Sequence, residues 1–112
     1  MASDHAIGQS LSARAFRSGF LKLAILRLVA ARPMHGYAMI ERLTASDWRP
    51  SPGSIYPTLQ EMQDGGLLSS RSDGRKQVYE ITPLGDEVLT VAMERTRASM
   101  LSLQRLLDYR PE

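Results

Sequence analysis

The stretch Ser51–Met62 constrains the fold of this chain more than any other segment. It begins like a helix, since Ser51 or Ser54 can serve as the N-cap and Pro52 suits the first helical position. Pro57 favours the start at Ser54: counted from there it falls in the first turn, whereas counted from Ser51 it removes an interior hydrogen bond. We therefore expect a loose first turn that becomes regular near Ser54.

Apolar side chains recur along one face of this predicted helix. Ile55, Leu59 and Met62 follow the i, i+4, i+7 spacing of a buried stripe. The opposite face is polar, uncharged at its start and rich in hydroxyl groups. Such a face can enter a DNA major groove with the helix N-terminus leading. Most amphipathic helices are merely structural, so this stretch alone does not assign DNA binding.

The composition is that of a globular domain. The chain has 112 residues, 43% of them hydrophobic and 23% charged, with a formal net charge of +2. This length fits one domain, and the weak positive charge is only slight support for a polyanionic partner. Because there is no cysteine, disulfide and thiolate chemistry are excluded. No apolar run reaches the roughly 18 residues of a membrane span, and the polar N-terminus does not resemble a signal peptide, so a cytoplasmic protein is expected.

A first helix is predicted before the central stretch. Residues 20–31 are dense in Leu, Ile, Val and Ala, which is typical of a helix buried on most sides. Phe16 and Phe20, one turn apart, can extend its apolar face backwards. Pro33 ends the helix, because the residue before a proline disfavours helical backbone angles.

A turn over residues 34–37 leads into a second helix, over roughly residues 37–44. Tyr37, Ile40 and Leu43 are expected on its buried side. His35 in the turn has no second histidine, cysteine or carboxylate pair nearby. We therefore interpret it as a capping or core hydrogen-bonding residue and not as a metal ligand.

A β-hairpin is predicted after the central helix. Gly65-Gly66 supplies a C-cap, and strands over residues 67–72 and 76–82 flank Asp73-Gly74, a strong hairpin signal. Three cations, Arg71, Arg75 and Lys76, gather at and near the tip of this hairpin.

The last helix is expected to begin at Pro83, with Thr82 as N-cap, and to run to about residue 108. One apolar strip on it has heptad-like spacing and predicts a dimer interface, formed by Leu89, Ala92, Thr96, Met100, Leu103 and Leu107. A second strip is expected to pack on the chain's own domain and comprises Leu84, Val88, Val91 and Leu101. A helix folding back on its own domain is the alternative, but two strips exceed what so small a domain can cover.

Three helices, a basic hairpin and a long helix are the order of a winged helix-turn-helix with a C-terminal dimerisation helix. The fold class is thus mainly α with a small β-hairpin. The segments 33–37, 51–59, 66–68 and 82–85 together resemble the PadR family of bacterial transcriptional regulators, in its compact subgroup with a single C-terminal helix. We divide the chain into an N-terminal arm or short helix (1–18), the DNA-binding domain (19–82) and the dimerisation helix (83–112).

The resemblance implies a homodimer that binds a palindromic operator in double-stranded DNA, often represses a neighbouring gene, and is released by a small hydrophobic or phenolic effector. The residues expected to contact DNA lie on the central helix and the hairpin: Ser51, Ser54, Tyr56, Pro57, Thr58, Gln60, Arg71, Arg75 and Lys76. An effector pocket is expected between the last helix and the N-terminal helices, lined by Phe16, Phe20, Met93 and Met100.

Two further expectations complete this interpretation. No catalytic site, metal site or cofactor is expected, because the sequence has no thiol, no glycine-rich phosphate loop and no supported Ser/His/acid set. The predicted recognition helix carries Glu61 and Asp64 but no lysine or arginine, so DNA affinity has to come from elsewhere. The same acidic residues support the alternative function, a winged-helix module that binds protein and not DNA.

Overall fold

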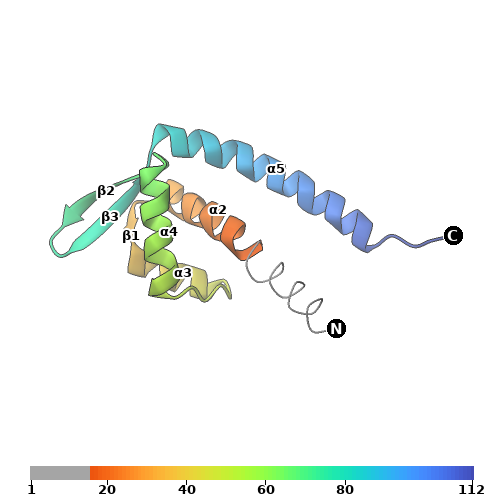
Figure 1. Ribbon diagram of the computed structural model, residues 1–112, viewed down its shortest axis with the longest axis horizontal. Helices are drawn as coiled ribbons and strands as arrows, with labels where there is room; N and C mark the ends of the chain where they lie inside the picture. Colours follow the sequence, from red (N-terminus) through yellow and green to blue (C-terminus); the bar gives the residue numbers. More distant parts are fainter. Residues whose placement is uncertain (1–15) are drawn as a thin grey trace.

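A computed structural model describes the backbone of residues 16–112 and the side chains of residues 19–112. The predicted arm therefore lies largely outside the described residues, as does the side chain of Phe16. The elements run in the order α2 (Phe16–Ala31), β1 (Met34–His35), α3 (Gly36–Ala45), α4 (Pro52–Asp64), β2 (Leu68–Asp73), β3 (Lys76–Ile81) and α5 (Pro83–Leu107). This confirms the mainly helical winged helix-turn-helix fold (Figure 1).

The core lies where α2, α3 and α4 meet the sheet. Ile25, Met39, Ile55 and Leu59 are fully buried there. The predicted stripe on the central helix is confirmed, since Met62 is also buried. Burying side chains of this size stabilises a fold by roughly 1.5–3 kcal/mol each, so the stripe fixes α4 with its opposite face outward.

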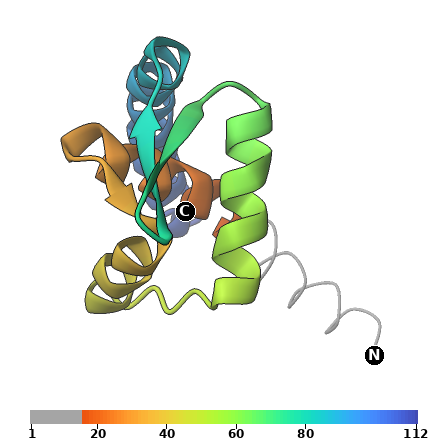
Figure 2. The ribbon, with the colours of Figure 1, turned by 90° about the vertical axis from the view of Figure 1, so that its left-hand side faces the viewer.

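The sheet has three strands and not the expected two. β1 pairs antiparallel with β3, through Met34 with Tyr79 and His35 with Val78, and gives the order β1-β3-β2. A strand of two residues is too short to show an alternating pattern, which is why the sequence suggested a turn there. In Figure 2, α4 lies on one side of the hairpin, and β1 with α3 lies on the other.

The expected buried face of α3 is confirmed in part, since Leu43 is buried and Ile40 packs on the core but Tyr37 does not. The buried residues of this helix are Gly36, Met39 and Leu43, whereas Tyr37 is 60% exposed. The helix begins at Gly36, with His35 as N-cap: Nδ1 of His35 accepts a hydrogen bond of 3.2 Å from the Ala38 N–H. The interpretation of His35 as a capping residue is thereby confirmed.

Helix α4 begins earlier than predicted. Ser51 is the N-cap and Pro52 the first helical residue, so Pro57 lies inside the helix. The N–H groups of Ser54 and Ile55 both bond to the Ser51 carbonyl, at 3.0 Å each. The first turn is therefore closed before Pro57 is reached, and the missing donor of Pro57 affects only an exposed part of the helix.

Two caps tie the end of α4 to the start of α5. Gly66, with a positive φ of 78°, ends α4 as expected, and the Leu67 N–H bonds to the Met62 carbonyl at 2.9 Å. The Thr82 hydroxyl accepts a bond of 3.0 Å from the Gly85 N–H and donates one of 2.6 Å to the Gly66 carbonyl. One side chain thus fixes the direction in which α5 leaves the sheet.

The two apolar strips of α5 do not lie as expected. Leu89, assigned to the dimer seam, is 5% exposed and belongs to the chain's own core. The strip expected to pack on the domain is instead exposed, as Leu84, Val88, Val91 and Leu101 show. The cause is the direction of α5: it contacts α2 and β3 near its start and then runs away from the domain (Figure 1).

Candidate nucleic-acid interface

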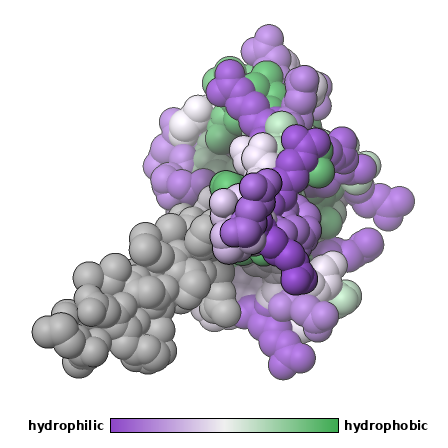
Figure 3. Space-filling model, turned by 90° about the vertical axis from the view of Figure 1, so that its right-hand side faces the viewer, coloured by the Kyte–Doolittle hydropathy of each residue, from purple (hydrophilic) through white to green (hydrophobic). Residues whose placement is uncertain are grey.

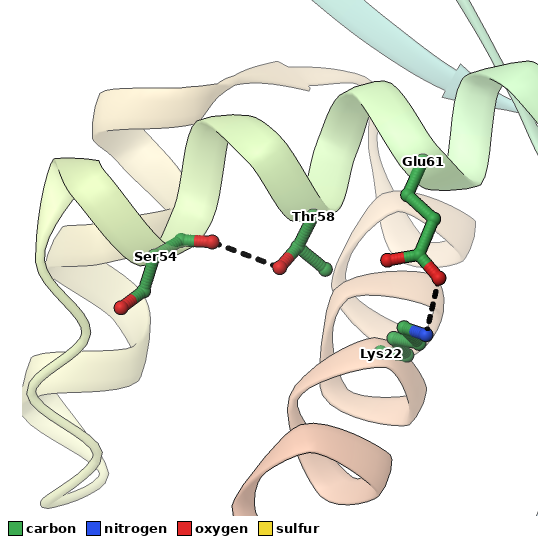
Figure 4. A network of polar contacts seen from close by, with 4 residues as sticks. All are labelled: Lys22, Ser54, Thr58 and Glu61. Carbon is green, nitrogen blue, oxygen red and sulfur yellow. Dashed lines mark hydrogen bonds and ion pairs between the residues drawn. The ribbon is translucent and has the colours of Figure 1, made fainter.

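The face of α4 that points outward is polar, and the opposite face of the helix packs on the core. Ser54, Tyr56 and Pro57 are exposed, and Thr58 is half-buried. The Thr58 hydroxyl donates a hydrogen bond of 2.8 Å to the Ser54 carbonyl, which fixes its rotamer (Figure 4). Because the hydroxyl proton is used in this bond, the oxygen is left as an acceptor, as contact with a base-edge amino group requires.

The remaining polar residues of this face contact one another. Ser51 Oγ lies 3.3 Å from Ser54 Oγ, and the Gln60 amide donates a hydrogen bond of 2.9 Å to an Asp64 carboxylate oxygen. Gln60 is therefore partly engaged within the helix. These contacts order the side chains, which lowers the entropy lost when a ligand binds.

Tyr56 occupies the space that a glycine provides. A Cβ atom at Gly36 would lie 2.6 Å from Cε1 of Tyr56, so the ring rests on the start of α3. The pKa of Tyr79 is raised by burial and, secondarily, by the neighbouring Tyr56. Tyr56 is 44% exposed, so one edge of its ring packs inward and the other belongs to the outer surface.

The acidic side chain at the middle of α4 has a cationic partner. Lys22 Nζ, from α2, lies 2.8 Å from Glu61 Oε1 (Figure 4). Both side chains are more than one third exposed, so the pair contributes little to stability, at most about 1 kcal/mol. The pair nevertheless offsets the negative charge of Glu61, which would otherwise repel a DNA phosphate. The sequence did not reveal this pair, because the two residues are far apart along the chain.

The wing is the hairpin β2–β3 with its turn at Gly74, whose φ is 65°. Arg75 and Lys76 lie at the tip, are exposed, and form no ion pair within residues 19–112. Arg71 lies further back, and its Nε donates to Glu80 at 3.1 Å. Two of the three predicted wing cations are therefore available to an external anion, and the third is partly compensated.

The expected effector residues have different surroundings. Phe20 makes an edge-on contact with Trp48, with ring centroids 6.4 Å apart, and Met93 packs on the core. Met100 is 57% exposed. A cleft of the described part lies elsewhere, between α3 and the wing.

The surface of α5 beyond Thr96 is rich in exposed apolar side chains. Met100, Leu103 and Leu107 of the predicted seam are 57%, 47% and 71% exposed, while Ala92 and Thr96 are half-buried. Figure 3 views the molecule from the end at which α5 finishes, where apolar groups interrupt a largely hydrophilic surface. Large apolar side chains grouped in this way are typical of an interaction surface.

Other kinds of site find no support in the part of the chain that the structure describes. Residues 16–112 hold no group of three or more His, Asp or Glu side chains arranged to bind a metal ion. No helix in the same range is both long and apolar enough to span a membrane.

Comparison with known proteins places these features in a family. The model of the transcriptional regulator PadR-like family matches residues 25–91. Transcriptional regulator Rv3488 of Mycobacterium tuberculosis is 38% identical over 81 residues, which cover 69% of this chain and 76% of that protein. Transcriptional regulator YqjI of Escherichia coli is 39% identical over 79 residues, covering 66% of this chain but only 38% of that longer protein.

Solved structures agree with this similarity. A PadR family transcriptional regulator from Eggerthella lenta has a TM-score of 0.80 at 23% identity, covering 98% of this chain and 99% of that one. A PadR-like transcriptional regulator from Bacillus cereus has a TM-score of 0.77 at 27% identity, covering 91% and 99%. The likeness extends along nearly the whole chain, α5 included.

Proposed function

The chain belongs to the PadR-like family of transcriptional regulators, and from that premise we propose that it is a sequence-specific DNA-binding repressor. It acts in the cytoplasm as a homodimer on a palindromic operator, and a small hydrophobic or phenolic effector releases it. The observation that carries the proposal is the juxtaposition of a helix face that is polar and uncharged at its start with a wing whose tip holds two cations, Arg75 and Lys76, without an ion pair among the described residues.

In this proposal α4 reads bases and the wing binds the backbone. Ser54 and Thr58 face base edges in the major groove, with Ser51, Tyr56, Pro57 and Gln60 around them. Arg75 and Lys76 bind phosphates of the adjacent strand or minor groove. Phosphate contacts supply most of the affinity and base contacts supply the specificity.

Dimerisation provides enough sequence to select one site in a genome. One recognition helix reads only a few base pairs, so two copies about 34 Å apart are needed. Met100, Leu103 and Leu107 form the exposed part of the proposed interface. Ala92 and Thr96, which precede these residues along α5, are small enough to let two helices approach closely.

The alternative function, a protein-binding winged helix without DNA affinity, has weaker support than the sequence suggested. It rested on the acidic residues of α4, but Glu61 is paired with Lys22 and Asp64 accepts a hydrogen bond from Gln60. The ion pair with Lys22 makes the face that would meet DNA less repulsive to phosphate than the sequence of α4 alone implies, although the neutral Gln60 amide leaves the charge of Asp64 in place.

A footprint of the protein on the DNA upstream of its own gene tests the proposal. A protected palindrome, with two half-sites one helical turn or a multiple of it apart, is the expected result. Fluorescence anisotropy with random duplex at low salt separates the alternatives: a DNA-binding protein shows salt-sensitive affinity, whereas a folded dimer that never binds duplex favours the protein-binding module.

A further inference from the structure

An open cleft lies between the start of α3 and the wing, with a volume of about 370 Å³. Its walls come from three parts of the chain that are distant in sequence: the α2–β1 junction, α3 and the hairpin. Its lining comprises Arg32, Pro33, Met34, His35, Ala38, Arg42, Arg71, Asp73 and Val78.

The register of the sheet explains which side chains meet there. His35, Val78 and Arg71 are paired across the three strands, so their side chains lie on one face. The neighbouring row contains Ser70, which bonds to Gln63 of α4 at 3.2 Å, and that row therefore faces the core. The cleft thus lies on the outer face of the sheet, away from α4.

The charges around the cleft are strongly unequal. Three arginines, Arg32, Arg42 and Arg71, line it together with a single carboxylate, that of Asp73. Arg71 is partly compensated by Glu80, whereas Arg32 and Arg42 form no ion pair within the range whose side chains are described. The lining therefore carries an excess of positive charge, and no ion pair within that range neutralises Arg32 or Arg42.

His35 adds a hydrogen-bond donor to the lining. Its Nδ1 accepts from the Ala38 N–H, so the proton of the neutral imidazole is on Nε2. The polar groups presented by Arg32, Arg42 and His35 are consequently all donors. A donor-rich, cationic cleft fits the fork geometry with which guanidinium groups bind phosphate or carboxylate oxygens.

We propose that this cleft is an oxyanion-binding site, which takes a phosphate or a carboxylate group through Arg32 and Arg42. The same chemistry has two sources: a backbone phosphate of bound DNA, or a free small anion. The first source rests on the proposed function, and it fits the position of the cleft beside the wing, since Arg71 and Asp73 of β2 contribute to its lining. The cleft would also supply the cations that α4 lacks.

The test removes both unpaired arginines in the variant Arg32→Gln/Arg42→Gln. A matched control, Arg97→Gln/Arg105→Gln, loses the same charge from the exposed surface of α5, far along the chain from the cleft. Thermal melting confirms that each variant is folded. Anisotropy with random duplex over a range of salt concentrations then gives the slope of log K against log salt for each protein.

Binding of a DNA phosphate predicts that the slope falls by about 2 in the cleft variant, one unit per lost contact, and stays near wild type in the control. Inorganic phosphate and phenyl phosphate probe the second source, against chloride at equal ionic strength. A free-anion site predicts that they shift the backbone NMR signals of Ala38 and Val78 in the wild type and not in the cleft variant.

A result with neither effect overturns the proposal. If the slope of the cleft variant stays at the wild-type value and neither phosphate compound shifts these signals, the cleft is not an oxyanion site. This failure is distinct from that of the proposed function, which shows as absence of duplex binding by the wild-type protein. In that case the NMR experiment alone decides between a free-anion site and none.

Discussion

Replacing Gly85 by alanine tests the packing that sets the direction of α5. Gly85 is buried in the first turn of that helix. A Cβ atom there would overlap the backbone carbonyl oxygen of Leu67 and lie 2.8 Å from Cγ1 of Ile81. The first of these neighbours is backbone, so no change of side-chain rotamer removes the overlap.

The Leu67 carbonyl cannot move without breaking other contacts. It accepts a hydrogen bond of 3.1 Å from the N–H of Thr82, and it lies 3.1 Å from the Thr82 hydroxyl, whose proton it shares with the closer Gly66 carbonyl. The Leu67 N–H in turn completes the C-cap of α4 through the Met62 carbonyl. A displacement of Leu67 therefore disturbs the end of α4 and the start of α5 together.

The magnitude follows from opposing contributions. Alanine is favoured over glycine in a helix by up to about 1 kcal/mol. Overpacking costs about 1–3 kcal/mol, and a weakened cap about 1 kcal/mol more. We expect Gly85→Ala to lower the free energy of unfolding by about 1–3 kcal/mol, which corresponds to a fall in Tm of roughly 5–20 °C.

Urea unfolding and calorimetry measure this change, with Gly53→Ala as the control. The nearest atom to a Cβ at Gly53 is Ser51 Oγ at 3.7 Å, an ordinary contact, so that variant should stay within about 1 kcal/mol of wild type. A Gly85→Ala protein as stable as the wild type would refute the reasoning, because α5 would then not require the close approach to Leu67.

Three other predictions concern the dimer, the α4 surface and a buried phenol. Leu103→Ala/Leu107→Ala removes two leucines of the proposed interface, and losing each leucine that is buried in the dimer costs about 2–5 kcal/mol of stability. Sedimentation should therefore show monomer or unfolded chain. A stable dimer with wild-type operator affinity would place the interface elsewhere. Glu61→Gln frees Lys22 and should tighten random-duplex binding with a stability change below about 1 kcal/mol; weaker binding would contradict this. Tyr79 should ionise last in an alkaline absorbance titration, a phase absent from Tyr79→Phe. Its contribution to stability is complete below the ordinary tyrosine pKa of 10.0 and is lost as pH rises through the raised pKa; simultaneous titration of all tyrosines would contradict the raised pKa.

The elements with strong local signals could be predicted from the sequence. The i, i+4, i+7 stripe of Ile55, Leu59 and Met62, the Gly66 cap and the Thr82-Pro83 helix start all occur as expected. Each depends on residues within a few positions of one another, so local physics is enough to specify them.

The features that depend on distant contacts could not be predicted. β1 exists because Met34 and His35 meet β3, and two residues carry no periodic signal. The pairing of Lys22 with Glu61 joins two helices that only the tertiary fold brings together.

The same limit applies to α5 and to the cleft. Which strip of α5 is buried depends on the direction in which the helix leaves Gly85. The glycine there allows close contact with the Leu67 backbone, and no pattern of apolar residues encodes that contact. The three arginines of the cleft come from the α2–β1 junction, α3 and β2, and they show no common spacing.

The most direct test of DNA binding through α4 and the wing is the salt dependence of duplex affinity for Arg75→Gln/Lys76→Gln. Wild-type protein should bind random duplex at low salt with an affinity that falls linearly as log salt rises. The variant should bind more weakly to every sequence, with a slope smaller by about 2, one unit per lost phosphate contact. A folded wild-type dimer without affinity for duplex at low salt would contradict the account, and an unchanged slope in the variant would remove the wing from it.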